Sequence, residues 1–342
     1  SILSLQIVAK CAQAGWRITS KDVFEMQTVR KVATRARKMV VSKSRQHILE
    51  GDAILTPIQR TFFEHDYQEP HHWNQSILLN VPPGFSLEQL KKSIGRLVTH
   101  HDSLRLRYKR SPEGWGQYYD QDAAEISIEE VDVSSTPQVE QSQTIEVAGD
   151  QLQAGLDITK GPLLRLAYFD FGANDHGRLL VVIHHLIMDA VSWRILLEDL
   201  ALLYNADPSK TAVRLPEKTT SYQDWASLLN QYANEDLVRR ELSYWGNPSR
   251  IRAIPFPRDF QISIEDDIEA NTTSVSRILS KQDTQALLQD VPGAYRTQVN
   301  DVLISALFKT IVEWTNGDTM LVDMEGHGRE ELFDDVTLSR TV

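Results

Sequence analysis

A pair of histidines ends an apolar run near the middle of the chain. Leu179–Ile183 has the length and composition of a buried strand, and His184 and His185 follow it directly. Asp189 comes four residues after the second histidine, where a helical pattern begins. Side chains alternate along a strand, so the two histidine rings are expected to point in opposite directions. The stretch fits either a histidine that transfers protons at the edge of a core, or a core histidine beside an aspartate that caps the next helix.

A carboxylate ends a second apolar run further along the sequence. Met320–Met324 is predicted to be a strand, and Glu325 opens the sequence Glu-Gly-His-Gly-Arg that ends at Arg329. The two glycines let the backbone turn sharply and approach a ligand closely. A histidine and a carboxylate on separate strand ends can face each other across a cleft and exchange protons with a substrate. A surface glutamate paired with Arg329 fits the same sequence.

Other kinds of site lack their sequence patterns. No H-x-x-x-H spacing or cysteine cluster supports a metal site, and His100-His101-Asp102 is predicted to be a helix end. No G-x-G-x-x-G, Walker loop or G-x-S-x-G elbow indicates a nucleotide, a flavin or a serine hydrolase. Ser192 lies too close to His185 in the sequence to argue for a catalytic triad. Proton transfer is therefore the chemistry that these residues favour.

Length and composition are those of a globular protein with two or three domains. The 342 residues are 41% hydrophobic and 24% charged. No apolar run approaches the roughly 20 residues of a membrane span, and nothing resembles a signal peptide. Cys11 is the only cysteine, which excludes an internal disulfide and indicates a reducing, cytoplasmic location.

Charge is unevenly distributed along the sequence. The net charge is −11, but residues 1–45 hold ten Lys and Arg against two acidic residues. Without interleaved aromatic residues, this basic segment is predicted to be a solvated helix and linker rather than a nucleic-acid site.

Helical and strand patterns alternate along the chain with long connections. This order predicts a mixed α/β fold of the α+β type rather than a doubly wound sheet. Strands are predicted over 76–81, 104–108, 126–131, 163–171, 179–183, 275–279 and 320–324. Helices are predicted over 55–64, 86–100, 139–153, 195–203, 221–245, 281–289 and 297–314.

Residues 1–38 are predicted to be a small helical unit, followed by a polar, basic linker at 39–51. Ser1–Ala9, Gly15 and Ile18–Glu25 resemble the later part of a peptidyl carrier domain from a nonribosomal peptide synthetase. The resemblance implies that Ser1 carries a covalent 4′-phosphopantetheine arm, the cofactor of such domains. By itself, a serine at this position is equally typical of a helix N-cap.

Five ordered motifs resemble the condensation superfamily of peptide synthetases. Residues 184–193 match the superfamily signature HHxxxDxxSW, and the continuation 191–199 resembles its epimerization branch. Four further segments resemble the same branch: Pro57-Ile-Gln59 with Phe62-Phe63, Thr297–Asp301, Glu325–Glu330 and Leu338–Val342. The chain thus resembles an epimerization domain that follows the end of its carrier domain.

The resemblance implies a V-shaped pseudo-dimer of two chloramphenicol-acetyltransferase-like lobes, with the active site in a tunnel between them. Residues 52–225 would form the N-terminal lobe and 226–342 the C-terminal lobe. In this family the second lobe continues beyond the Arg340–Val342 signature. The second lobe is therefore expected to be incomplete here, with unpaired strand edges.

The implied reaction inverts Cα of an aminoacyl or peptidyl residue, from L to D, while a thioester holds it on the carrier arm. His185 and Glu325 are predicted to be the catalytic pair, and the direction of proton transfer between them stays open. Asp189 is predicted to orient the motif through an arginine. The predicted supporting residues are His184, Asp189, Asn300 and Arg329.

The implied partners are a carrier-bound thioester, an adenylation domain upstream and a condensation domain downstream, with neither nucleic acid nor membrane. Two alternative functions remain. One is peptide-bond formation that uses the same histidine, and the other is a catalytically silent module that docks carrier domains.

Overall fold

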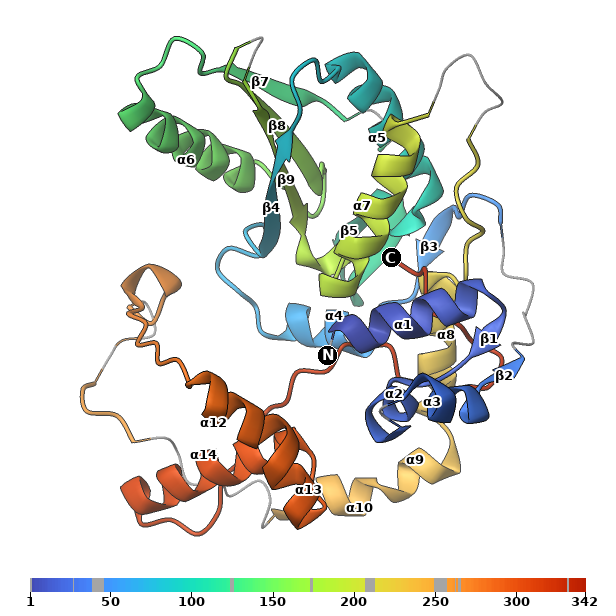
Figure 1. Ribbon diagram of the computed structural model, residues 1–342, viewed down its shortest axis with the longest axis vertical. Helices are drawn as coiled ribbons and strands as arrows, with labels where there is room; N and C mark the ends of the chain where they lie inside the picture. Colours follow the sequence, from blue (N-terminus) through green and yellow to red (C-terminus); the bar gives the residue numbers. More distant parts are fainter. Residues whose placement is uncertain are drawn as a thin grey trace. The chain divides into compact units, whose positions relative to one another are not determined.

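A computed structural model describes residues 2–26, 28–38, 46–123, 126–172, 175–206, 213–248, 257–261, 263, 266–330 and 332–342 (Figure 1). The chain divides into two compact units, Ser1–Asn234 with His327–Val342, and Glu235–Gly326. They are called the first and the second unit below, and each is described by itself. The units do not coincide with the four segments expected from the sequence, whose boundaries stay a prediction.

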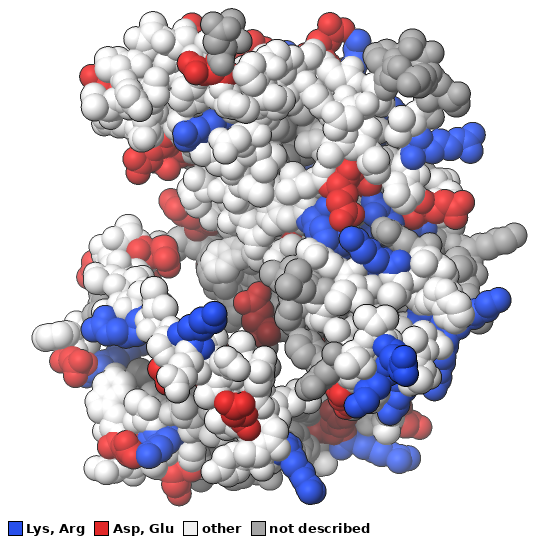
Figure 2. Space-filling model, viewed as in Figure 1, with Lys and Arg blue, Asp and Glu red and all other residues white. Residues whose placement is uncertain are grey.

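Three short helices open the first unit, as the sequence predicts. Gly15, with a φ of 80°, follows the first helix in the left-handed region that favours glycine. The Thr19 N–H donates to Asp22 Oδ2 at 3.0 Å, and the Asp22 N–H donates to Thr19 Oγ1 at 2.9 Å, which is a reciprocal cap. Lys and Arg side chains gather over this part of the visible face (Figure 2). The elements are α1 (Ile2–Gln13), α2 (Ser20–Met26) and α3 (Val29–Arg35), with β1 (Trp16–Arg17) paired antiparallel to β2 (Arg37–Lys38).

A four-stranded sheet forms the centre of the first unit, in the strand order β4-β9-β8-β7. β4 (Asn74–Val81) and β8 (Leu164–Asp170) both pair antiparallel with β9 (Gly177–His184). β7 (Ile128–Asp132) runs parallel to β8, and α6 (Gln138–Ala154) makes the crossover that a parallel connection needs.

Helices cover both faces of this sheet, which explains why β9 is apolar along most of its length. Leu180 and Val182 pack in a cluster with Leu152 of α6. Val181 and Ile183 point the other way, into the larger core. That core includes residues of α5 (Leu87–His100) and α7 (Ala190–Tyr204). Figure 1 shows α6 on one side of the sheet and α5 with α7 on the other.

A second, antiparallel sheet has the strand order β3-β6-β5. The strand predicted at 104–108 begins two residues later, because Asp102–Arg105 forms a 3-10 turn. The sequence did not predict β6, since Gly114 and Gly116 interrupt its alternating pattern. The strands are β3 (Gly51–Ala53), β5 (Leu106–Ser111) and β6 (Gly114–Tyr119), and the helices α4 (Pro57–Glu64) and α8 (Tyr222–Tyr232) belong to the same unit.

The described residues of 327–342 belong to the first unit and form neither helix nor strand. The Thr220 N–H donates to Thr337 O at 3.0 Å, and the Arg340 N–H donates to Thr219 Oγ1 at 3.2 Å. The Thr341 hydroxyl donates to Thr220 O at 2.6 Å. These bonds fix the segment along residues 219–220.

Helices and irregular segments make up the described part of the second unit. The strands predicted at 275–279 and 320–324 are wrong, since neither segment pairs with a strand among the described residues. A strand needs a partner for its backbone groups, and here Val275 and Ile278 are instead 81% and 97% exposed. The helix predicted over 221–245 is also wrong in length, because it is broken after Tyr232. The helical elements are α9 (Asp236–Arg240), α10 (Leu242–Trp245), η3 (Glu269–Asn271), α12 (Lys281–Gln285), η4 (Ala286–Asp290), α13 (Val291–Tyr295) and α14 (Val299–Thr315).

No helix within the described ranges is long and apolar enough to cross a membrane.

Candidate active site

His184 is the last residue of β9, and its ring is held inside the core. Its Nδ1 accepts from the Leu186 N–H at 3.1 Å, so Nε2 carries the ring proton and donates to Pro70 O at 2.8 Å. Burial lowers the pKa of His184 to about 4, although the bond to Pro70 opposes this. A neutral ring with both nitrogens occupied is a structural histidine that shapes the turn after β9.

His185 opens that turn, η2 (His185–Ile187), and is half-buried. Its N–H donates to Trp73 O at 2.8 Å, which continues the β4–β9 pairing by one residue. Its ring contacts other groups than the ring of His184 does. Nδ1 lies 2.9 Å from Met188 O, and Nε2 lies 3.0 Å from Nε2 of Gln75. His185 is therefore the histidine of the pair with a ring at the edge of the core.

A buried polar network supports the turn from behind. Gln59, the third residue of α4, donates through Nε2 to Tyr108 Oη at 3.0 Å and to Leu186 O at 3.2 Å. The Tyr108 hydroxyl donates to Leu186 O at 2.9 Å. Gln59 also accepts from the Thr56 N–H at 3.0 Å. The motif around Pro57 thus ties α4 to the backbone that carries His185.

Asp189 caps α7 and faces an arginine from the C-terminal segment. It accepts from the Ser192 N–H at 2.7 Å, which stabilises the first turn of the helix. Arg329 donates to both of its oxygens, through Nη2 at 2.9 Å and through Nε at 3.1 Å. Burial would raise the pKa of Asp189, but the charge and hydrogen bonds of Arg329 outweigh it and hold the pKa below the usual 3.8.

Every N–H of the Arg329 guanidinium has an acceptor. Besides its two bonds to Asp189, Nη2 donates to Ser192 Oγ at 3.2 Å. Nη1 donates to Leu338 O at 2.8 Å and to Thr341 O at 2.7 Å. The planar fork of arginine fits such an arrangement, whereas a lysine ammonium does not. Arg329 therefore pairs with Asp189 and not with a surface glutamate, so one alternative drawn from the sequence is wrong.

The remaining predicted site residues lie elsewhere. Glu325 belongs to the second unit, where it is exposed in an irregular segment. Asn300 is exposed in the first turn of α14, in the same unit. Ser1 lies outside the described residues. The first unit therefore brings together His184, His185, Asp189 and Arg329, and the second unit holds Glu325 and Asn300.

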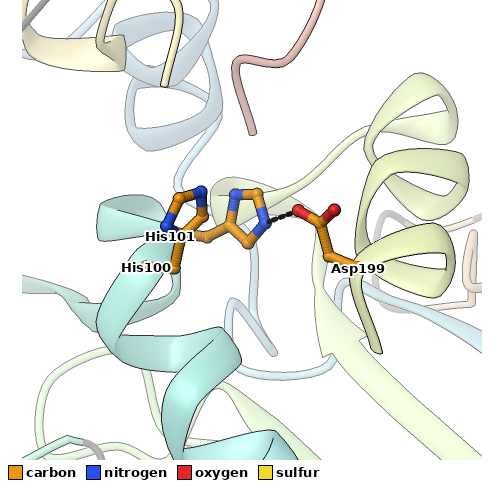
Figure 3. Close-up of side chains that lie close together, drawn as sticks. All are labelled: His100, His101 and Asp199. Carbon is orange, nitrogen blue, oxygen red and sulfur yellow. Dashed lines mark hydrogen bonds and ion pairs between the residues drawn. The ribbon is translucent and has the colours of Figure 1, made fainter. Parts of the chain in front are cut away.

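A further buried polar cluster joins α5 to α7 (Figure 3). His100 ends α5, as the sequence predicts, and His101 Nε2 lies 2.9 Å from Asp199 Oδ2. The three side chains are close enough to suggest metal ligands. However, Arg340 Nη2 donates to Asp199 Oδ1 at 2.5 Å. A guanidinium on the only carboxylate of the cluster already neutralises it and repels a metal ion, so these residues are better suited to anchoring the C-terminal segment.

Comparison with known proteins identifies the family. The family model of the condensation domain matches residues 49–342. The chain belongs to the condensation domain family. This membership accounts for the histidine pair at the end of β9 and for the mixed α/β fold.

Relatives of this condensation-family chain are large peptide synthetases. One part of the linear gramicidin synthase of Brevibacillus parabrevis is 42% identical over 344 residues, covering 100% of this chain and 7% of the relative. Surfactin synthase subunit 2 from Bacillus subtilis (strain 168) is 36% identical over 343 residues, covering 100% of this chain and 10% of the relative. The chain thus spans a tenth or less of the length of these relatives.

One solved structure is similar in both sequence and fold. The epimerization domain from the third module of tyrocidine synthetase B is 34% identical, with a TM-score of 0.75, over 88% of this chain and 66% of that domain. The SgcC5 protein from Streptomyces globisporus shares the fold at 18% identity, with a TM-score of 0.53 over 72% of this chain and 55% of that protein. The predicted mixed α/β fold class is confirmed.

Proposed function

We propose that this condensation-family chain epimerizes Cα of an aminoacyl or peptidyl thioester held on the phosphopantetheine arm of a carrier domain. The observation that carries this proposal is its similarity to a solved epimerization domain, at 34% identity over 88% of the chain. The matched family supplies the histidine pair, and the Glu325-Gly-His-Gly-Arg329 sequence supplies a second ionisable group.

The substrate chemistry suits two protonatable side chains. A thioester delocalises its sulfur lone pair weakly onto the carbonyl, so its α-proton is more acidic than that of an amide. One group removes this proton, and the C–H electron pair passes onto the carbonyl oxygen as an enolate. A second group then protonates the opposite face of Cα. We assign these roles to His185 and Glu325, each contributing about 10²–10⁴-fold in rate.

The supporting residues hold the first of these groups in place. His184 and Gln59 fix the backbone of the turn, and Asp189 with Arg329 fixes the start of α7. Asn300 is proposed to assist from the second unit. These contacts leave the ring of His185 as the ionisable group of the turn that can meet a substrate.

The cofactor and the partners follow from the same proposal. Ser1 would carry 4′-phosphopantetheine, and the arm would supply the thioester. An adenylation domain upstream would select the amino acid, and a condensation domain downstream would use the D-residue. The synthases that this chain resembles are consistent with such multidomain surroundings.

Peptide-bond formation is the second candidate, because the matched family model is that of the condensation domain. The two reactions give different products. An epimerase changes the configuration of one carrier-bound residue, whereas a condensation domain joins two.

The test is deuterium exchange into an L-aminoacyl pantetheine thioester, supplied free in solution or on the carrier serine of the full-length protein. In deuterated buffer, epimerization gives α-deuterium and a mixture of L and D thioester. Glu325→Gln and His185→Gln should each lower inversion at least about 10²-fold. Failure of the unaltered protein to exchange under either mode of supply would reject the epimerase proposal.

A control separates chemistry from surface charge in the second unit. Glu313→Gln makes the same chemical change at an exposed residue of α14, which lies 3.8 Å from Lys309. This variant should exchange as the unaltered protein does. Formation of a dipeptide from two loaded substrates, without deuterium uptake, would instead favour condensation.

A further inference from the structure

Gln75 lies on β4, beside the turn that carries His185. In the antiparallel register it stands opposite Ile183, and the pairing continues from Trp73 O to the His185 N–H. Its side chain is half-buried and reaches both the ring of His185 and the indole of Trp193 on α7. No motif in the sequence singles out Gln75, because only the strand register brings it to the histidine.

The indole of Trp193 fixes the orientation of the Gln75 amide. Trp193 Nε1 lies 3.0 Å from Gln75 Oε1. An indole nitrogen can only donate, so the atom facing it must be the amide oxygen. The amide nitrogen therefore faces His185.

The orientation of Gln75 in turn fixes the tautomer of His185. Gln75 Nε2 lies 3.0 Å from His185 Nε2 and can only donate, so His185 Nε2 must carry the lone pair. On the other side of the ring, Nδ1 lies 2.9 Å from Met188 O, which can only accept. Nδ1 therefore carries the proton. Two independent contacts select the same tautomer.

We propose that Gln75, held by Trp193, is a positioning residue for His185: it keeps Nε2 unprotonated and occupies this atom until a substrate displaces it. This inference rests on the proposed epimerase function. It identifies Nε2 as the atom that exchanges the proton, with Nδ1–H bonded to the backbone throughout.

The proton balance is simple. When the substrate α-carbon replaces the Gln75 amide, its C–H bond breaks and the electron pair moves to the thioester carbonyl. The proton goes to Nε2, so the ring becomes an imidazolium that still donates from Nδ1 to Met188 O. The nearby ionisable groups of the motif do not compete, since His184 is a neutral core residue and Asp189 is paired with Arg329.

The first test is independent of activity. In ¹⁵N-histidine-labelled full-length protein near neutral pH, the His185 resonances should show a protonated Nδ1 and an unprotonated Nε2. Gln75→Glu puts an acceptor where the donor was, so Nε2 should become protonated. A proton on Nε2 in the unaltered protein would overturn the proposal, whether or not the protein is an epimerase.

The second test uses deuterium exchange into an L-aminoacyl pantetheine thioester. Gln75→Glu should lower exchange at neutral pH about 10²-fold. The acid limb of its rate–pH profile should move up by about 1 to 3 pH units, because an opposite charge within hydrogen-bond distance stabilises the imidazolium. Trp193→Phe removes one donor and should lower exchange about 2- to 10-fold without moving the profile as far.

A matched control lies on the same strand. Asn80→Asp also converts an amide to a carboxylate on β4, at an exposed position. Its profile should stay that of the unaltered protein. Equal profiles for Gln75→Glu and Asn80→Asp would refute the positioning role. If the unaltered protein exchanges nothing, the epimerase function fails, and the tautomer measurement still decides the role of Gln75.

Discussion

Replacing Arg340 by methionine should destabilise the first unit more than any exposed charge change. Arg340 donates to Asp199, and the two side chains are 5% and 0% exposed. Methionine keeps much of the apolar volume but leaves Asp199 with His101 as its remaining partner in the cluster. Removing one partner of a buried ion pair costs about 3–5 kcal/mol. We expect the lower end, about 3 kcal/mol, because Arg340 Nε has no hydrogen-bond partner among the described residues and already lowers the net gain.

The assay is urea unfolding of the full-length protein, followed by circular dichroism and tryptophan fluorescence. Arg340→Met should lower the free energy of unfolding by about 3 kcal/mol. In the Asp199→Asn background, the same change should cost at least about 1 kcal/mol less, because the buried charge is gone.

The matched control is Lys92→Met. Lys92 pairs with Glu88 at 2.6 Å, but these side chains are 68% and 79% exposed. Its loss should therefore stay within about 0.5 kcal/mol. An Arg340→Met cost below about 1 kcal/mol, or one that Asp199→Asn leaves unchanged, would refute the reasoning from burial.

Two further predictions concern the histidine motif. The pKa of His184 is about 4 in the folded protein against 6.5 in the unfolded chain. The unfolded chain thus binds the proton first, and stability should fall by roughly 3 kcal/mol as the pH drops from 6.5 to 4. His184→Asn should lose this part of the pH dependence in urea unfolding, and an unchanged slope would contradict it. Arg329→Lys keeps the charge but not the fork that grips Asp189, so it should lower stability by about 1–3 kcal/mol. Unfolding of this variant at the urea midpoint of the unaltered protein would show that charge alone suffices.

The sequence alone determined the local elements of the first unit. The apolar length of Leu179–Ile183 predicted the strand, and the cap at Asp189 predicted the start of α7. The helix at Pro57 and the cap between Thr19 and Asp22 were likewise readable. Each depends on residues within four positions of one another, so neighbouring side chains suffice to specify it.

Strands of the second unit could not be predicted in the same way. Residues 275–279 and 320–324 have strand-like compositions, yet they pair with no strand in the described part of the chain. Strand propensity expresses a fit to neighbouring strands more than a preference of the backbone. Composition therefore overestimated the sheet content of this unit.

Tertiary structure decided which side chains meet at the site. Gln75 and His185 are 110 residues apart in sequence, Asp189 and Arg329 are 140 apart, and Asp199 and Arg340 are 141 apart. The sequence supplied the histidine and the aspartate, but neither the tautomer of His185 nor the partner of Asp199. A side chain gains such partners only when strand register and chain return bring distant backbone together. The sequence thus determined which groups can react, and the fold determined which hydrogen bonds hold them ready.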